Sequence, residues 1–79
     1  MILRELLKEV EYTLVQGSEE IEITALCYDS RKVVPDSVYV CIPGTIVDGH
    51  DFIENAIQAG AGAIVISKDV TISSELTVI

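Results

Sequence analysis

Basic side chains are few in this sequence. Five Lys and Arg residues stand against thirteen Asp and Glu residues, which gives a formal net charge of −8 at pH 7. Proteins bind nucleic acids and anionic membranes through clustered Lys and Arg, so the composition argues against partners of either kind. Arg31 and Lys32 form the only basic pair. An anionic ligand must therefore be bound by a few local groups and not by a broad basic surface.

The sequence also has no long hydrophobic run and few cysteines. No apolar stretch approaches the roughly 18 residues of a membrane-spanning helix, and Arg4 and Glu5 interrupt the start of the chain, where a signal peptide is uniformly apolar. We therefore expect a cytoplasmic protein. Cys27 and Cys41 lie among apolar neighbours without CxxC spacing, which indicates reduced thiols in the core.

The residues that are present suffice for one small domain. The chain has 79 residues, of which 49% are hydrophobic. This composition is typical of a globular chain, and the length leaves no room for a second lobe. The sequence ends inside an apolar stretch at 75–79, so we expect residues 1–79 to form a single domain of a longer protein.

Hydrophobic spacing predicts an α/β fold. Residues 2–10 have the spacing of an amphipathic helix, and residues 21–27 alternate as in a half-buried strand. The apolar runs 38–42 and 63–66 are typical of strands covered on both faces. Residues 75–79 resemble the start of a further strand.

A helix is expected between the two buried runs. Asp51 and Glu54 have the spacing of a capping box at its start, and Gly60 is placed to end it. A strand, a crossover helix and a parallel strand form a right-handed βαβ unit. We therefore predict a small three-layer α/β domain whose mixed sheet contains this unit.

The carboxyl ends of the strands are the expected ligand edge, because open α/β sheets bind ligands there. These ends carry the segments 28–31 and 43–50. Gly44 and Gly49 have the spacing of P-loop glycines, but His50 and Asp51 stand where that motif has Lys and Ser or Thr. A P-loop is therefore excluded, and the sequence contains no GxGxxG dinucleotide motif.

Each polar candidate at this edge has a functional and a structural interpretation. His50 could act as a base or metal ligand, but a single His at a helix start more often makes structural hydrogen bonds. Asp29 either caps its own turn or positions a ligand. Ser30 is a hydrogen-bonding group rather than a nucleophile, and Arg31 either grips a phosphate or is solvated.

Aromatic side chains fall into two groups. Tyr39 and Phe52 have the positions of core residues, whereas Tyr28 lies at a strand end where its ring could stack on a base. The residues by themselves thus point to a small domain that binds an anion or a nucleotide.

Four ordered blocks resemble the N-terminal domain of the Mur ligases, in particular the MurE type. They are Tyr-Asp-Ser-Arg-Lys-Val at 28–33, Val-Tyr-Val-Cys-Ile-Pro-Gly at 38–44, Val-Asp-Gly-His-Asp-Phe-Ile at 47–53 and Gly-Ala at 60–61. The resemblance covers nearly the whole chain. Ligases of the MurE type add the third peptide residue, meso-diaminopimelate or lysine, to UDP-N-acetylmuramoyl-L-alanyl-D-glutamate in peptidoglycan synthesis.

The resemblance implies that this domain holds the uridine diphosphate end of the substrate. ATP, Mg²⁺ and the amino-acid acceptor would bind the central and C-terminal domains of the family, so this chain alone is expected to bind no cofactor and to be inactive. The family's contacts fall on Tyr28 and Ser30 and, after the glycine, on Thr45, Ile46 and Val47. With the neighbouring polar groups of the two segments, the predicted substrate-binding set is Tyr28, Ser30, Arg31, Thr45, Ile46, Val47, Asp48, Gly49 and His50.

The chain departs from the family pattern at two places. Pro35-Asp36-Ser37 replaces the usual proline-glycine-aspartate, which suggests a different turn, and Thr45 replaces a histidine or tyrosine. A MurF-type ligase, which adds D-alanyl-D-alanine, is the alternative within the family. A free-standing α/β regulatory or interaction module is the alternative outside it.

Overall fold

The computed structural model of this chain describes residues 1–42, 48–68, 70, 72 and 76–79. Four short strands form one sheet in the order β1-β2-β3-β4. The strands are β1 (Leu26–Cys27), β2 (Val38–Val40), β3 (Ala63–Val65) and β4 (Thr77–Val78), and the helices are α1 (Leu3–Leu6), η1 (Ser30–Lys32), η2 (Gly49–Phe52) and α2 (Ile53–Gln58). None of the helices described is long and apolar enough to cross a membrane.

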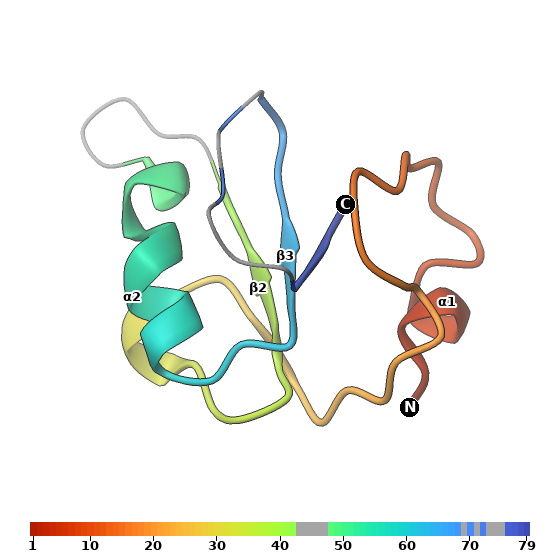
Figure 1. The fold of residues 1–79 in the computed structure, drawn as a ribbon, viewed down its shortest axis with the longest axis horizontal. Coiled ribbons are helices and arrows are strands. Elements are labelled where there is room, and N and C mark those ends of the chain that lie inside the picture. Colours follow the sequence, from red (N-terminus) through yellow and green to blue (C-terminus); the bar gives the residue numbers. More distant parts are fainter. Residues whose placement is uncertain (43–47, 69, 71, 73–75) are drawn as a thin grey trace.

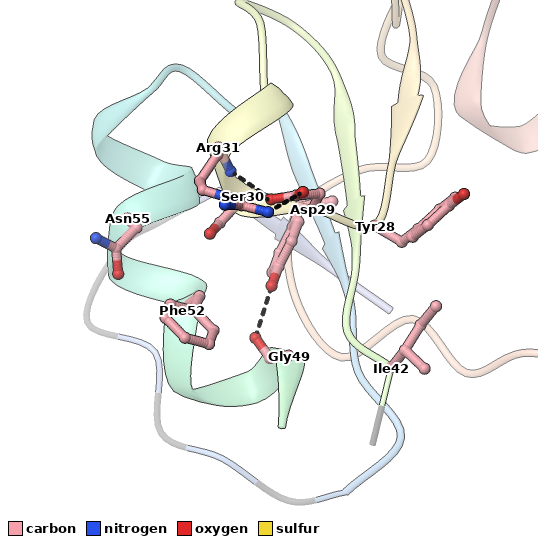
Figure 2. A pocket seen from close by; sticks show the side chains of 9 residues that line it. Tyr28, Asp29, Ser30, Arg31, Ile42, Gly49, Phe52 and Asn55 are labelled. Carbon is pink, nitrogen blue, oxygen red and sulfur yellow. Dashed lines mark hydrogen bonds and ion pairs between the residues drawn. The ribbon is translucent and has the colours of Figure 1, made fainter. Parts of the chain in front are cut away.

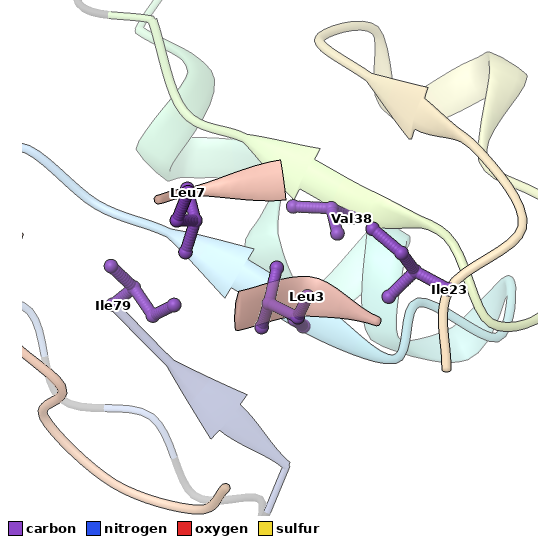
Figure 3. Packing of buried hydrophobic residues seen from close by; sticks show 6 residues of the cluster. Leu3, Leu7, Ile23, Val38 and Ile79 are labelled. Atoms are coloured by element: carbon purple, nitrogen blue, oxygen red, sulfur yellow. The ribbon is translucent and has the colours of Figure 1, made fainter. Parts of the chain in front are cut away.

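The elements form three layers, with α1 and α2 on opposite faces of the sheet (Figure 1). Alternate residues of β2 and β3 face opposite sides, since side chains along a strand alternate. Val38 and Ala63 pack with Leu3 on the α1 side, as part of the cluster in Figure 3, whereas Tyr39 and Ile64 belong to the cluster on the α2 side. The predicted three-layer α/β architecture is confirmed.

The predicted pairing of the two buried strands is also confirmed. β2 and β3 are parallel neighbours joined through α2. The right-handedness of this crossover stays a prediction. All three strand pairings are parallel. A mixed sheet implies antiparallel pairing as well. In the described residues this pairing is limited to two isolated bridges, Ile2 with Glu22 and Gln16 with Val78. Gly17, which follows Gln16, has φ of 82°.

The first helix and first strand are shorter than the spacing predicted. Helix α1 ends at Leu6, and β1 contains only the last two residues of the run 21–27. The start of that run bonds to the chain's N-terminal residues instead of to the sheet: the Leu3 amide donates to the Ile21 carbonyl, and the Ile23 amide donates to the Met1 carbonyl. These backbone groups are therefore satisfied without a longer strand.

The capping-box prediction for Asp51 is wrong. Asp48 caps the turn η2 by accepting the His50 amide at 2.9 Å, and α2 continues from Phe52 without a side-chain cap. The α-helix thus starts one residue later than the sequence spacing predicted, directly after the 3₁₀ turn η2. At the other end Gly60 terminates α2 as predicted, with φ of 105°.

Gly60 completes a Schellman motif. Its amide donates to the Ile57 carbonyl, and the Ala61 amide donates to the Ala56 carbonyl, which satisfies the last carbonyls of the helix. Its own carbonyl accepts from the Asp36 amide. The end of α2 is therefore joined to the turn that precedes β2.

In that turn Asp36 stands where the family pattern has a glycine. Asp36 takes φ of 63°, the conformation that a glycine adopts without cost, and the Ser37 amide donates to the Val34 carbonyl at 3.2 Å. Proline at the second position and a positive φ at the third define a type II turn. The different turn suggested by the sequence is therefore not required, because Asp tolerates this region better than most residues.

Two of the predicted core side chains differ from expectation. Tyr39 and Cys41 are buried as predicted, and burial raises the pKa of the Cys41 thiol to about 11. Cys27 is only half-buried, and both cysteines are free thiols. Phe52 is 37% exposed, because η2 places it on the outer side of the turn while the next residue, Ile53, enters the core.

We predict that Gly60→Ala destabilises the fold by about 1–2 kcal/mol, the usual cost of a left-handed conformation for a residue with a Cβ atom. The added Cβ would also lie 3.1 Å from Pro35 Cα. Gly62→Ala is the matched control, because its Cβ would meet Asp36 Cα at an ordinary 3.4 Å. Urea unfolding at pH 7 measures both, and equal losses for the two variants would contradict the assignment of the Gly60 conformation.

Candidate functional site

The candidate site lies where β1 and β2 end, at the edge predicted from the sequence. The chain leaves β1 through Tyr28 and Asp29 into η1, and it leaves β2 toward η2. A cavity of about 610 Å³ lies between these turns and the start of α2. Its walls include the side chains of Tyr28, Ser30, Arg31, Ile42, Phe52 and Asn55 (Figure 2).

Asp29 organises the first turn. Its Oδ1 accepts the Arg31 backbone amide at 3.0 Å and Arg31 Nε at 3.1 Å, while its Oδ2 accepts Arg31 Nη2 at 3.0 Å. These bonds hold the pKa of the Asp29 carboxyl at about 2 and raise the pKa of Arg31. The structural interpretation of Asp29 as the cap of its own turn therefore describes these contacts, and the Arg31 charge is paired within the turn.

A second network joins the turns that follow β2 and β3. His50 Nδ1 lies 2.6 Å from Asp48 Oδ1, and the Ser67 amide donates to His50 Nε2 at 3.0 Å. Since Nε2 accepts, the proton of the neutral ring is on Nδ1, where it is donated to Asp48. Lys68 Nζ donates to the other carboxylate oxygen at 2.6 Å.

The charged members of this network support one another electrostatically. Hydrogen bonds from Lys68 and His50 hold the pKa of the Asp48 carboxyl well below its usual range, and the same carboxylate raises the pKa of Lys68. The His50 side chain is only 1% exposed, and both of its ring nitrogens are used. Its ring therefore contacts the protein interior, as the structural interpretation of a single His expects.

Gly49 brings η2 against the end of β2. The Tyr39 hydroxyl donates to the Gly49 carbonyl at 2.8 Å, and the Gly49 amide donates to the Ile42 carbonyl at 3.0 Å. A Cβ atom at Gly49 would lie 2.7 Å from the Ile42 nitrogen, a distance that requires the backbone to move. Tyr39 and Gly49 thus form the floor of the cavity.

The predicted site residues divide into three groups. Tyr28, Ser30, Arg31 and Gly49 line the cavity. Asp48 and His50 form the network behind it and do not line it, while Thr45, Ile46 and Val47 lie outside the described residues. The substrate contacts assigned to all of these residues stay predictions.

Sequence reasoning missed several residues at this edge. Phe52 and Asn55 line the cavity from η2 and α2, and Ser67 and Lys68 reach the network from the end of β3. The pattern Asp-Phe at 51–52 fits a helix start with a core stripe, and it gives no sign of the 3₁₀ turn in front of α2. Across the described residues, no group of three His, Cys, Asp or Glu residues has the arrangement of a metal site.

Comparison with known proteins decides the family. Residues 22–79 match the family described as "Mur ligase family, catalytic domain". The chain belongs to the Mur ligase family. It is 39% identical over all 79 residues to the UDP-N-acetylmuramoyl-L-alanyl-D-glutamate--2,6-diaminopimelate ligase of Clostridium perfringens, and 49% identical over 71 residues to the enzyme of the same name from Alkaliphilus metalliredigens. These alignments cover 100% and 90% of this chain but only 16% and 14% of the two relatives.

Solved Mur ligases have a similar fold in this region. The MurF ligase of Thermotoga maritima, solved in complex with ADP, matches 70% of this chain and 13% of its own length, with a TM-score of 0.59 and 31% identity. The MurF of Acinetobacter baumannii matches 76% of this chain and 13% of its own length, with a TM-score of 0.65 and 20% identity. The resemblance to the Mur ligases noted in the sequence is confirmed.

We predict that Asp48→Asn lowers stability at pH 7 and flattens its decline in acid. Because the pKa of Asp48 is lower in the folded chain than the unfolded value near 4, its contribution is present above about pH 4 and is lost as the pH falls toward the folded pKa. Urea midpoints at pH 7, 4 and 2.5 measure this effect.

Asp51→Asn is the control for this prediction, since it removes a negative charge from the same turn and leaves the contacts of Asp48 intact. It is expected to keep the loss of stability in acid that comes from Asp48. An Asp48→Asn profile parallel to that of the wild type would show that the network contributes no pH-dependent stability.

Proposed function

We propose that this chain is the domain that holds the uridine diphosphate end of UDP-N-acetylmuramoyl-L-alanyl-D-glutamate in an ATP-dependent ligase of peptidoglycan synthesis. The observation that carries the proposal is the match over the whole chain to ligases whose names contain this substrate. The cavity at the strand ends supports it, because its volume of about 610 Å³ suits a ligand of nucleotide size.

The larger enzyme would add the third peptide residue, meso-diaminopimelate or lysine. The names of the relatives support diaminopimelate. ATP and Mg²⁺ would bind central and C-terminal domains of that enzyme, a proposal that the small share of the relatives covered by this chain, 16% and 14%, supports. The ADP bound in the Thermotoga MurF structure supports the use of a nucleotide in the family. The 79-residue chain alone is expected to be inactive, and the whole enzyme is expected in the cytoplasm.

A MurF-type activity is the weaker alternative. The two diaminopimelate ligases cited above are 39% and 49% identical to this chain, whereas the Thermotoga MurF is 31% identical over a smaller share of it. The substrate of a MurF-type enzyme would present the same uridine diphosphate end, so the assignment of the nucleotide end does not depend on this choice.

The decisive experiment is an NMR titration of the 79-residue chain with UDP-N-acetylmuramoyl-L-alanyl-D-glutamate, with ATP as the control ligand. Shifts confined to the segments 28–32 and 44–50 and to the neighbouring cavity wall are expected with the UDP-sugar and not with ATP. Equal shifts with ATP, or none with the UDP-sugar at millimolar concentration, would reject the proposal that this chain supplies the nucleotide site.

We predict that Ser30→Ala weakens binding of the UDP-sugar about fivefold. This factor corresponds to the roughly 1 kcal/mol that one hydrogen bond contributes, and folding should be little affected, since the hydroxyl lines the cavity. Thr13→Ala removes a hydroxyl from an exposed position that does not line this cavity and should leave the dissociation constant unchanged. If the two variants bind equally well, Ser30 is not a contact.

A further inference from the structure

A second hollow lies on the side of the sheet that faces away from α2. Its volume is about 450 Å³, and it lies between residues 10–15 and the ends of β3 and β4. Its apolar walls include Leu7, Val10, Val15, Val65 and Ile79. Leu7 and Ile79 belong to the core cluster on the α1 side and are labelled in Figure 3. The hollow shares no lining residue with the cavity at the ends of β1 and β2, so it is a separate feature of the surface.

Apolar side chains along residues 10–15 are exposed to solvent. Val10 is 55% exposed, Val15 is 58% exposed and Leu14 is 39% exposed. Single exposed apolar residues are ordinary on a protein surface. Three of them in this short stretch, beside an apolar hollow, form a patch of the kind that marks an interaction surface.

The backbone of this stretch is anchored at both ends and open in the middle. The Val10 amide donates to the Leu7 carbonyl, and the Val15 amide donates to the Val78 carbonyl, which holds the end of the stretch beside β4 (Figure 1). Within the part of the chain that the structure describes, residues 11–14 make no backbone hydrogen bond. Their N–H and C=O groups are therefore available to an added extended chain, as at the free edge of a sheet.

Charge selects the kind of chain that the hollow accepts. Its lining contains one carboxylate, Glu11, and one ammonium group, Lys68. Lys68 Nζ is bonded to Asp48 at 2.6 Å, whereas Glu11 has no partner among the described residues. Glu19 adds a second carboxylate, because it accepts the hydroxyl of Tyr12, another residue of the wall, at 2.7 Å. The uncompensated charge at the hollow is therefore negative, and it favours a basic partner.

We propose that the hollow and residues 10–15 bind an extended, basic segment of a protein partner. Apolar side chains of that segment enter the hollow against Val65 and Ile79, its backbone pairs with residues 11–14, and its Lys or Arg side chains lie beside Glu11. The inference does not depend on the proposed function, because the hollow is separate from the substrate cavity. We expect the same surface in relatives that keep the length of this stretch.

The test uses three blocked hexapeptides as probes of the 79-residue chain: alternating Lys and Val, alternating Lys and Ser, and alternating Glu and Val. The Lys–Val peptide is expected to bind and to shift the amide resonances of residues 10–15 and 65–68. The Lys–Ser peptide keeps the charge but lacks the apolar side chains, and the Glu–Val peptide reverses the charge. Each of these two is expected to bind roughly fivefold more weakly, which corresponds to about 1 kcal/mol.

Two variants test the contacts, each with a matched control. Val10→Ser removes part of the apolar wall and should weaken binding of the Lys–Val peptide about fivefold. Val34→Ser changes an exposed valine outside the hollow and should leave the affinity unchanged. Glu11→Gln should weaken binding about threefold, the usual scale of an exposed ion pair, and Glu5→Gln, at an exposed position outside the hollow, is its control.

Thermal unfolding of each variant separates binding from folding. Glu11 is exposed, so its variant keeps the test valid if Val10→Ser unfolds.

Three results would overturn the inference. Equal binding of the Lys–Ser and Lys–Val peptides would show that the acidic charge of the whole chain attracts the probe. Equal affinities of Val10→Ser and Val34→Ser, with shifts outside residues 10–15 and 65–68, would place the contact elsewhere. Absence of binding at millimolar peptide, or self-association that shifts the same residues without peptide, would show that the hollow does not bind a basic segment. The titration with the UDP-sugar tests the proposed function independently of all three.

Discussion

The carboxylate of Asp48 is the contact on which the ligand edge depends. It accepts the amide that starts η2, the ring N–H of His50 and the ammonium of Lys68. One side chain thereby joins the turn after β2 to the turn after β3. Beyond the backbone ladder of these parallel neighbours, the Asp48 carboxylate adds a side-chain link between the turns at their ends. The position of η2, and with it the floor and one wall of the cavity, follows from this tie.

The order of strands and helices was predictable because it depends on hydrophobic periodicity. The strands β2 and β3 lie within the predicted runs 38–42 and 63–66, and their core residues alternate between two clusters as the period of two requires. Gly60 ended its helix as expected, since a left-handed residue there is the common way to finish one. These features are local in sequence and strong in composition.

The features that were not predictable depend on contacts that the spacing of residues in the sequence does not show. Asp51 fits a capping pattern, but Asp48 caps η2, and its other carboxylate oxygen accepts from Lys68, twenty residues away. The exposed position of Phe52 results from the 3₁₀ turn that this cap starts. The spacing of apolar residues contains no sign of that turn. The sequence leaves Arg31 available to a ligand, because its pairing with Asp29 depends on the geometry of η1.

Side chains along β2 alternate between the two faces of the sheet, so the number of residues between the preceding turn and β2 is fixed. Val38 faces α1 and Tyr39 faces α2 in a strand of three residues. One residue inserted between the type II turn and β2 would reverse these directions. The Tyr39 hydroxyl would then leave the Gly49 carbonyl, and the cavity floor would be lost together with the packing of α2. Insertions and deletions in homologues should therefore avoid positions 34–40 and collect in stretches such as 8–14, whose side chains are mostly exposed.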